Sequence, residues 1–117
     1  MDRLLDHART GPLYLARPEI ASIVVKAIQE GRDTLQHYQL HAFVVMANHV
    51  HLLITPKAPV PTLLQWLKGT TARRANQVLE LTGRAFWQEE SYDHWVRDER
   101  EFRRIHAYIE ENPVRAG

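Results

Sequence analysis

Residues 38–55 hold two strand-forming runs, and they constrain the fold more than any other part of the sequence. Both runs, YQLHAFVVM and HVHLLIT, are rich in Val, Leu, Ile and Phe, which favour strands. They flank Ala47-Asn48, and asparagine tolerates the positive φ of a tight hairpin turn. A two-residue turn would place Val44 opposite His51. The segment therefore predicts an antiparallel hairpin.

Alternation along the strands divides the side chains of this hairpin between two faces. One predicted face carries Ala42, Val44, Met46, His49, His51 and Leu53. The other face is nearly all apolar and should meet the core helices; it carries His41, Phe43, Val45, Val50, Leu52 and Ile54. We therefore expect the two histidines of HVH to project together from the face opposite these helices.

Helical patterns precede and follow the hairpin. Residues 19–30 carry one apolar stripe, with Pro18 suited to the first turn and Gly31 to the C-terminal end. Residues 62–81 predict a second helix, which Gly83 would close.

The C-terminal part predicts a short strand at YDHWV, followed by a last helix. Asp98 is the expected N-cap of that helix, and Glu101 stands three residues later, as in a capping box. Pro113 would end the helix, because the residue before a proline disfavours helical angles. The buried stripe of the helix is predicted at Phe102, Ile105 and Ile109.

The order helix, hairpin, helix, short strand, helix predicts an α+β fold, an antiparallel sheet with packed helices. The chain has 117 residues, 44% hydrophobic and 25% charged, which is typical of one compact domain. Because the evident strands make only a thin sheet, we expect that one strand is missing upstream and that another is missing downstream.

Composition excludes some classes of chemistry and location. The chain contains no cysteine, which rules out disulfides, thiolate metal sites and cysteine nucleophiles. No apolar run approaches the roughly 18 residues of a membrane span, and the first residues do not resemble a signal peptide. We therefore expect a cytoplasmic protein without a membrane partner. The net charge is only +1, so a nucleic-acid partner would have to meet a local basic face.

The H-x-H of the hairpin is a candidate metal site. On a strand, His49 and His51 point to one side with α-carbons about 6–7 Å apart, which suits two ligands of one divalent ion. The alternative is that both are partly exposed strand residues without a ligand. The motif alone does not decide between the two.

Tyr108 and Asn112 are candidate site residues on the last helix, because residues four apart stack on one helix face. Glu101 and Arg104 share that general direction, so a phenol, an amide and a guanidinium would point the same way. The alternative for Tyr108 is an amphipathic residue at the margin of the buried stripe, with its hydroxyl in water.

Three cations on the middle helix could form a nucleic-acid surface. Between residues 62 and 88 the sequence has four cations and one acid, Glu80. The alternative is an ordinary solvated helix face. The three cations are Lys68, Arg73 and Arg74.

Two long segments resemble a known family. LHAFVVMANHVHLLITP and FWQEESYDHWVRDEREFRRIHAYIEENPVRAG, with LKGTTARRAN between them, resemble the single-tyrosine HUH transposases. The similarity is to the REP-associated tyrosine transposases, relatives of small insertion-sequence transposases. It runs from about residue 9 to residue 117. It implies a ferredoxin-like, RRM-like HUH fold over residues 1–117. We expect this chain to depart from the family by being short at both termini and by lacking an outer strand.

The resemblance also implies a site and an activity. His49 and His51 would bind Mg²⁺ or Mn²⁺, with Asn112 as a third ligand, and Tyr108 would be the nucleophile. The reaction would be cleavage and strand transfer of single-stranded or hairpin-forming repeat DNA through a 5′-phosphotyrosine. Lys68, Arg73, Arg74 and Arg104 would contact the DNA. The resemblance leaves the oligomeric state open between monomer and homodimer, because insertion-sequence members often dimerise and the REP-associated branch need not.

Other functions compete with this one. The first is a catalytically inactive DNA-binding remnant, which would not need Tyr108 and the two histidines together. The second is a metal-dependent phosphodiesterase with a water nucleophile, which would form no tyrosine adduct. The third is an α+β interaction module whose histidines are structural and bind no metal.

Overall fold

The computed structural model describes residues 2–9, 14–87, 92–96 and 98–111. Its strands and helices follow the order β1-α1-β2-β3-α2-β4 of ferredoxin-like domains, and α3 comes last. The predicted α+β class is therefore confirmed. The elements are β1 (Arg3–Arg9), a 3-10 helix η1 (Tyr14–Ala16), α1 (Pro18–Asp33), β2 (Tyr38–Val45), β3 (His49–Pro56), α2 (Val60–Leu79), β4 (Tyr92–Trp95) and α3 (Glu99–Glu111).

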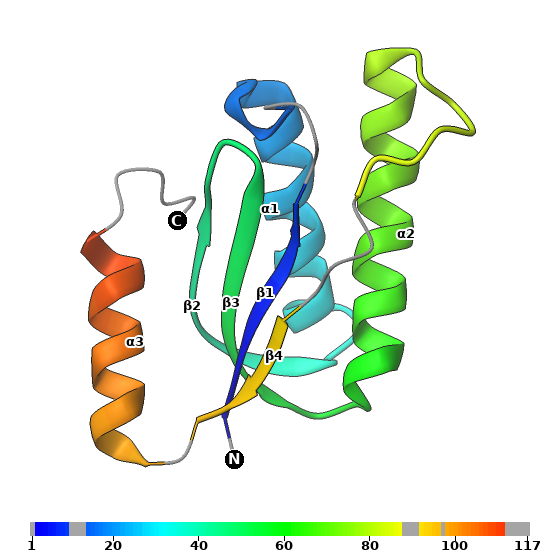
Figure 1. Ribbon diagram of the computed structural model, residues 1–117. Coiled ribbons are helices and arrows are strands. Elements are labelled where there is room, and N and C mark those ends of the chain that lie inside the picture. The colour runs from blue at the N-terminus through cyan, green and yellow to red at the C-terminus, as the bar shows by residue number, and fades with distance from the viewer. Residues whose placement is uncertain (1, 10–13, 88–91, 97, 112–117) are drawn as a thin grey trace.

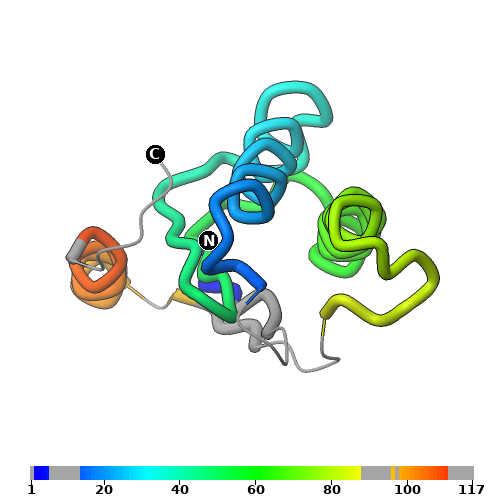
Figure 2. The backbone as a smooth tube through the Cα atoms, turned by 90° about the horizontal axis from the view of Figure 1, so that it is seen from above, coloured from blue at the N-terminus to red at the C-terminus, as the bar shows by residue number. Residues whose placement is uncertain are grey.

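The strands form one sheet in the order β2-β3-β1-β4, and each neighbouring pair is antiparallel. Helices α1 and α2 cover one face of the sheet, and α3 lies on the other (Figures 1 and 2). Each side has its own buried cluster. The larger one, with α1 and α2, includes Leu5, Ile20, Val24, Ile28, Val50, Leu52, Ile54, Leu63 and Leu67. The smaller one, with α3, consists of Ala42, Val44, Leu53, Val96 and Ile109.

Strand β1 corrects the expectation that an upstream strand is missing. Arg3–Arg9 lies in the middle of the sheet, between β3 and β4. Leu5 is fully buried in the larger cluster, and Leu4 packs against the smaller one. Two adjacent leucines among polar residues give no long alternating pattern. The pairing rests on backbone hydrogen bonds, which any side chain allows, so the strand was not evident from its sequence.

The hairpin forms with the predicted turn and, except at His41, with the predicted faces. The Met46 N–H donates to the His49 carbonyl at 2.8 Å, which closes the two-residue turn. Val44 lies opposite His51, as expected. His51 lines a pocket with side chains of α3, so the histidine face is the one that α3 covers.

His41 lies on the α3 face, and its predicted place on the apolar face was wrong. A β-bulge between Leu40 and Ala42 adds one residue to β2, which reverses the alternation at that point. The His41 ring packs edge-on against Phe102 of α3, with ring centroids 5.2 Å apart. Its Nε2 lies 2.6 Å from the hydroxyl oxygen of Thr55, which also donates to a carboxylate oxygen of Asp2.

Helix α2 ends earlier than its sequence suggested. Glu80, with φ of 59°, forms the left-handed C-cap, and Gly83 lies in the turn that follows. Across the described segments, no helix is long and apolar enough to cross a bilayer.

The sequence had indicated Gly31 as the C-terminal end of this helix. Gly31 instead lies inside α1, because the helix continues to Asp33. Its missing side chain makes room for Tyr38 at the start of β2. A Cβ atom at Gly31 would lie 2.5 Å from the Tyr38 hydroxyl oxygen. That buried hydroxyl donates to the Ile28 carbonyl at 2.6 Å, which ties α1 to the sheet.

Gly31→Ala should therefore lower the free energy of unfolding by about 1–3 kcal/mol, because the added methyl group overpacks a buried contact. Gly69→Ala is the matched control, since Gly69 is exposed within α2 and a Cβ there meets nothing within 4 Å. It should raise stability by about 0.5–1 kcal/mol through helix propensity. Urea unfolding measures both changes, and a Gly31→Ala protein as stable as wild type would contradict the packing described.

Candidate active site

His49 and His51 form an imidazole pair at the start of β3. They stand two residues apart, so the pleat directs both rings to the face that α3 covers. Their ring centroids are 4.8 Å apart and the rings are nearly perpendicular, at 87°. His49 Nδ1 lies 2.8 Å from the side-chain oxygen of Asn48, which holds the ring in place and leaves Nε2 to meet a ligand.

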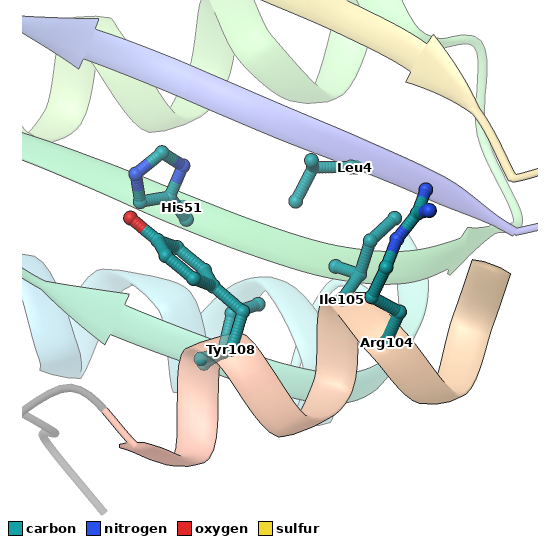
Figure 3. A pocket seen from close by; sticks show the side chains of 6 residues that line it. Leu4, His51, Arg104, Ile105 and Tyr108 are labelled. Atoms are coloured by element: carbon teal, nitrogen blue, oxygen red, sulfur yellow. The ribbon is translucent and has the colours of Figure 1, made fainter.

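Tyr108 comes to this pair from α3. The Asp98 carboxylate accepts the Glu101 N–H at 2.8 Å, so the predicted N-cap is confirmed. Ile109 is fully buried against the sheet, and Tyr108 beside it remains 54% exposed. The rings of Tyr108 and His51 have centroids 6.2 Å apart at 84°. In Figure 3 the phenol hydroxyl points toward His51.

A pocket of about 260 Å³ opens between α3 and the sheet. Tyr108 and His51 stand near one end of the row of lining side chains, and Arg104 stands near the other (Figure 3). Leu4 and Ile105 face each other between them. This pocket could not be predicted from the sequence, because its walls come together only where β1, β3 and α3 meet. Its lining residues are Leu4, His51, Arg104, Ile105, Tyr108 and Ile109.

Arg104 lies one helical turn before Tyr108 and is largely exposed, with 74% of its side chain accessible. One of its guanidinium nitrogens is 3.6 Å from a carboxylate oxygen of Glu101. Glu101 is buried, at 6% exposure, so a negative group lies beneath the guanidinium. The guanidinium is thus held near the pocket and remains open to an anionic ligand.

The cations of the middle helix do not join this site. Helix α2 lies across the sheet from α3, so Lys68, Arg73 and Arg74 are on the opposite side from Tyr108 (Figure 2). Arg74 donates two hydrogen bonds to the Glu30 carboxylate of α1, at 2.9 and 3.1 Å. These bonds hold the pKa of Glu30 below its usual value. Burial lowers the pKa of the Lys68 ammonium group.

The spacing of the two imidazole rings matches the spacing that one shared divalent ion would give. Metal–imidazole bonds are about 2 Å long, so an ion bound to a nitrogen of each ring places the rings near each other at about the separation found here. In the described part of the chain, no group of three or more His, Cys, Asp or Glu side chains could hold a metal. The predicted third ligand, Asn112, lies outside the described residues.

Fold and site together define a ferredoxin-like domain whose imidazole pair meets a helical tyrosine across one face of the sheet. A sequence profile described as "Transposase IS200 like" matches residues 16–112. The chain belongs to this family. No curated protein sequence matches it.

Two solved structures have a similar fold. A candidate transposase from Deinococcus radiodurans R1 has 26% identity and a TM-score of 0.63, and the match covers 94% of this chain and 88% of that one. A REP-associated tyrosine transposase bound to a REP hairpin has 18% identity and a TM-score of 0.72, over 96% of this chain and 65% of that one. At that identity, the second likeness shows the fold.

Proposed function

We propose that this transposase-family protein cuts and rejoins single-stranded DNA by transesterification, with Tyr108 as the nucleophile. The observation that carries the proposal is the meeting of Tyr108 and His51 beside one pocket, from elements far apart in the sequence. A structural histidine pair would not need an exposed phenol beside it. Family membership gives the proposal its reaction class.

The reaction exchanges one phosphodiester for another. The Tyr108 hydroxyl oxygen attacks phosphorus and forms a 5′-phosphotyrosine, while the bond to the 3′ oxygen breaks and leaves a free 3′-hydroxyl. Attack by another 3′-hydroxyl reverses the step and releases the tyrosine. Because the bond types on both sides are alike, no external energy source is required.

Two groups would serve this chemistry, the Tyr108 hydroxyl and the Arg104 guanidinium. The Tyr108 hydroxyl must lose its proton as its oxygen attacks phosphorus. The neighbouring pocket wall is polar only at its ends, where His51 and Arg104 stand. Arg104 is placed to neutralise charge on the phosphate oxygens, and arginine suits phosphate because its guanidinium donates in a planar fork.

His49 and His51 would hold the divalent metal, Mg²⁺ or Mn²⁺, with Asn112 as the proposed third ligand. When bound, the ion would polarise a non-bridging oxygen of the scissile phosphate. Nitrogen ligands favour Mn²⁺ over Mg²⁺. The imidazole geometry supports this assignment, and the role of Asn112 stays a prediction.

The proposed substrate is a hairpin-forming DNA repeat with an adjacent single strand. The solved REP-associated transposase was bound to a REP hairpin, which makes this the first substrate class to test. Arg104 would contact the strand at the active site, and Lys68 and Arg73 would bind phosphates on the far side. Such contacts are salt-dependent.

A covalent-adduct assay tests the proposal. The protein is incubated with Mn²⁺ and single-stranded hairpin oligonucleotides from repeats that flank its gene, each labelled at either the 5′ or the 3′ end. We expect a denaturation-resistant protein–DNA band that carries the 3′ label only. Cleavage without this band would favour a water nucleophile, and binding without cleavage would favour an inactive remnant.

Two arginine variants compare Arg104, which is proposed to contact DNA, with Arg74, which is held by Glu30. Arg104→Ala should reduce the slope of log affinity for DNA against log salt concentration by about 1, the value expected for one lost phosphate contact. Arg74→Ala, the matched control, should leave that dependence unchanged, because the Arg74 guanidinium is bound to Glu30. Titration of DNA at several salt concentrations measures both. Equal losses in the two variants would contradict the separate roles given to these arginines.

A further inference from the structure

The pocket beside Tyr108 has an apolar middle between polar ends. Leu4 of β1 and Ile105 and Ile109 of α3 supply its aliphatic walls. The phenol and imidazole stand near one end and the Arg104 guanidinium near the other (Figure 3). A metal and a phosphate account for the polar groups, but neither needs the aliphatic surface between them.

Leu4 and Ile105 remain only partly buried, although both pack against the smaller core cluster. Their apolar surface therefore borders an open space and not a filled core. Leaving such surface in contact with water forgoes stabilisation that a bound apolar group would restore. A ligand that fits must combine a flat or aliphatic body with a nearby negative charge.

We infer that this pocket binds the unpaired base of a nucleotide next to the scissile phosphate. The inference rests on the proposed function and names a subsite of that active site. The base would lie between Leu4 and Ile105, with the scissile phosphate at the Tyr108 end of the pocket and a neighbouring phosphate at the Arg104 end. Charge complementarity and continuity with the nucleophile favour a nucleotide over a lipid or a peptide side chain.

The pocket is large enough to hold an unpaired base. The volume of about 260 Å³ is just below the range of about 300–1,000 Å³ that is typical of pockets for drug-sized ligands. Unpaired bases bind proteins through stacking and apolar contact, which every base can make. The aliphatic walls would therefore select by size and shape more than by hydrogen-bond pattern.

A substrate–protein double-mutant cycle tests this subsite. Three oligonucleotides are used. One is the intact hairpin substrate, and the other two each carry one abasic residue, on one or the other side of the scissile phosphate. The protein variants are Ile105→Phe and Leu4→Phe, which fill the pocket from opposite walls. Ala107→Phe is the matched control, because Ala107 is exposed on the same helix and does not line the pocket. Circular dichroism and thermal unfolding establish that each variant is folded.

For the wild-type protein, removing the base on one side of the cut should reduce the adduct rate about tenfold. Filling the pocket should reduce the rate on the intact substrate by a similar factor, and little further on that abasic substrate. Ala107→Phe should behave like wild type on every substrate. Additive losses in both filled variants, or no effect of either abasic residue, would overturn the inference.

The cycle also separates this inference from the proposed reaction. If wild-type protein forms no adduct with any substrate, the transesterification proposal fails. The same oligonucleotides are then compared by equilibrium binding. A preference for the base-bearing strand that is lost in the filled variants would uphold the base pocket, and equal affinities would overturn it.

Discussion

Tyr108→Phe should abolish the covalent protein–DNA adduct, with a loss of about 10³-fold or more. The substitution removes one oxygen atom, and that oxygen is the proposed nucleophile. The aromatic ring stays, so its packing beside Ile109 and its ring contact with His51 should persist. DNA affinity and thermal stability should therefore change little, by about twofold and about 0.5 kcal/mol at most.

Tyr14→Phe is the matched control for this experiment. Tyr14 stacks on Phe86 with ring centroids 5.6 Å apart, in the part of the molecule that belongs to the larger core cluster. Adduct formation should be unaffected in this variant. An adduct of normal yield with Tyr108→Phe protein would show that another residue is the nucleophile, and strand cleavage without an adduct would point to water.

The double substitution His49→Ala and His51→Ala should remove metal-dependent cleavage, with a loss of about 100-fold or more. It should also remove the stabilisation of the protein by Mn²⁺, which does not depend on turnover. An ion at 100 times its dissociation constant stabilises a folded protein by about 2.7 kcal/mol. Thermal unfolding with and without Mn²⁺ measures this term.

His106→Ala serves as the control, because His106 lies on α3 beside Phe102 and not beside the imidazole pair. It should keep both the cleavage activity and the stabilisation by Mn²⁺. The metal assignment fails if the double variant is still stabilised by Mn²⁺ to the same extent as wild type. It also fails if wild type shows no stabilisation over a wide range of concentrations.

The hairpin and the tyrosine helix could be predicted because their signals are local. Alternation placed His49 and His51 on one face, and the turn at Ala47-Asn48 fixed the register. The spacing of Ile105 and Ile109 defined the buried side of α3 and left Tyr108 at its margin. Each of these features depends on residues within a few positions of one another.

Other parts of the fold depend on contacts between distant segments. Strand β1 is held by backbone bonds to two neighbours, and its short sequence carries little pattern. The bulge at His41 is one extra residue in a strand, which side-chain alternation does not reveal. Arg74 donates to Glu30 of another helix, a contact that the residues around Arg74 in the sequence do not reveal. The pocket draws its walls from β1, β3 and α3.

Mass spectrometry of the trapped complex tests the central claim most directly. After the reaction with the hairpin oligonucleotide, the DNA is digested to a short remnant and the protein is cut with trypsin. Cleavage after Arg104 and Arg115 releases residues 105–115, a peptide that contains a single tyrosine, Tyr108. We predict that this peptide carries the nucleotide, joined through a 5′ phosphate to the tyrosine. A nucleotide on any other peptide, or cleaved DNA with no linked peptide, would contradict the account.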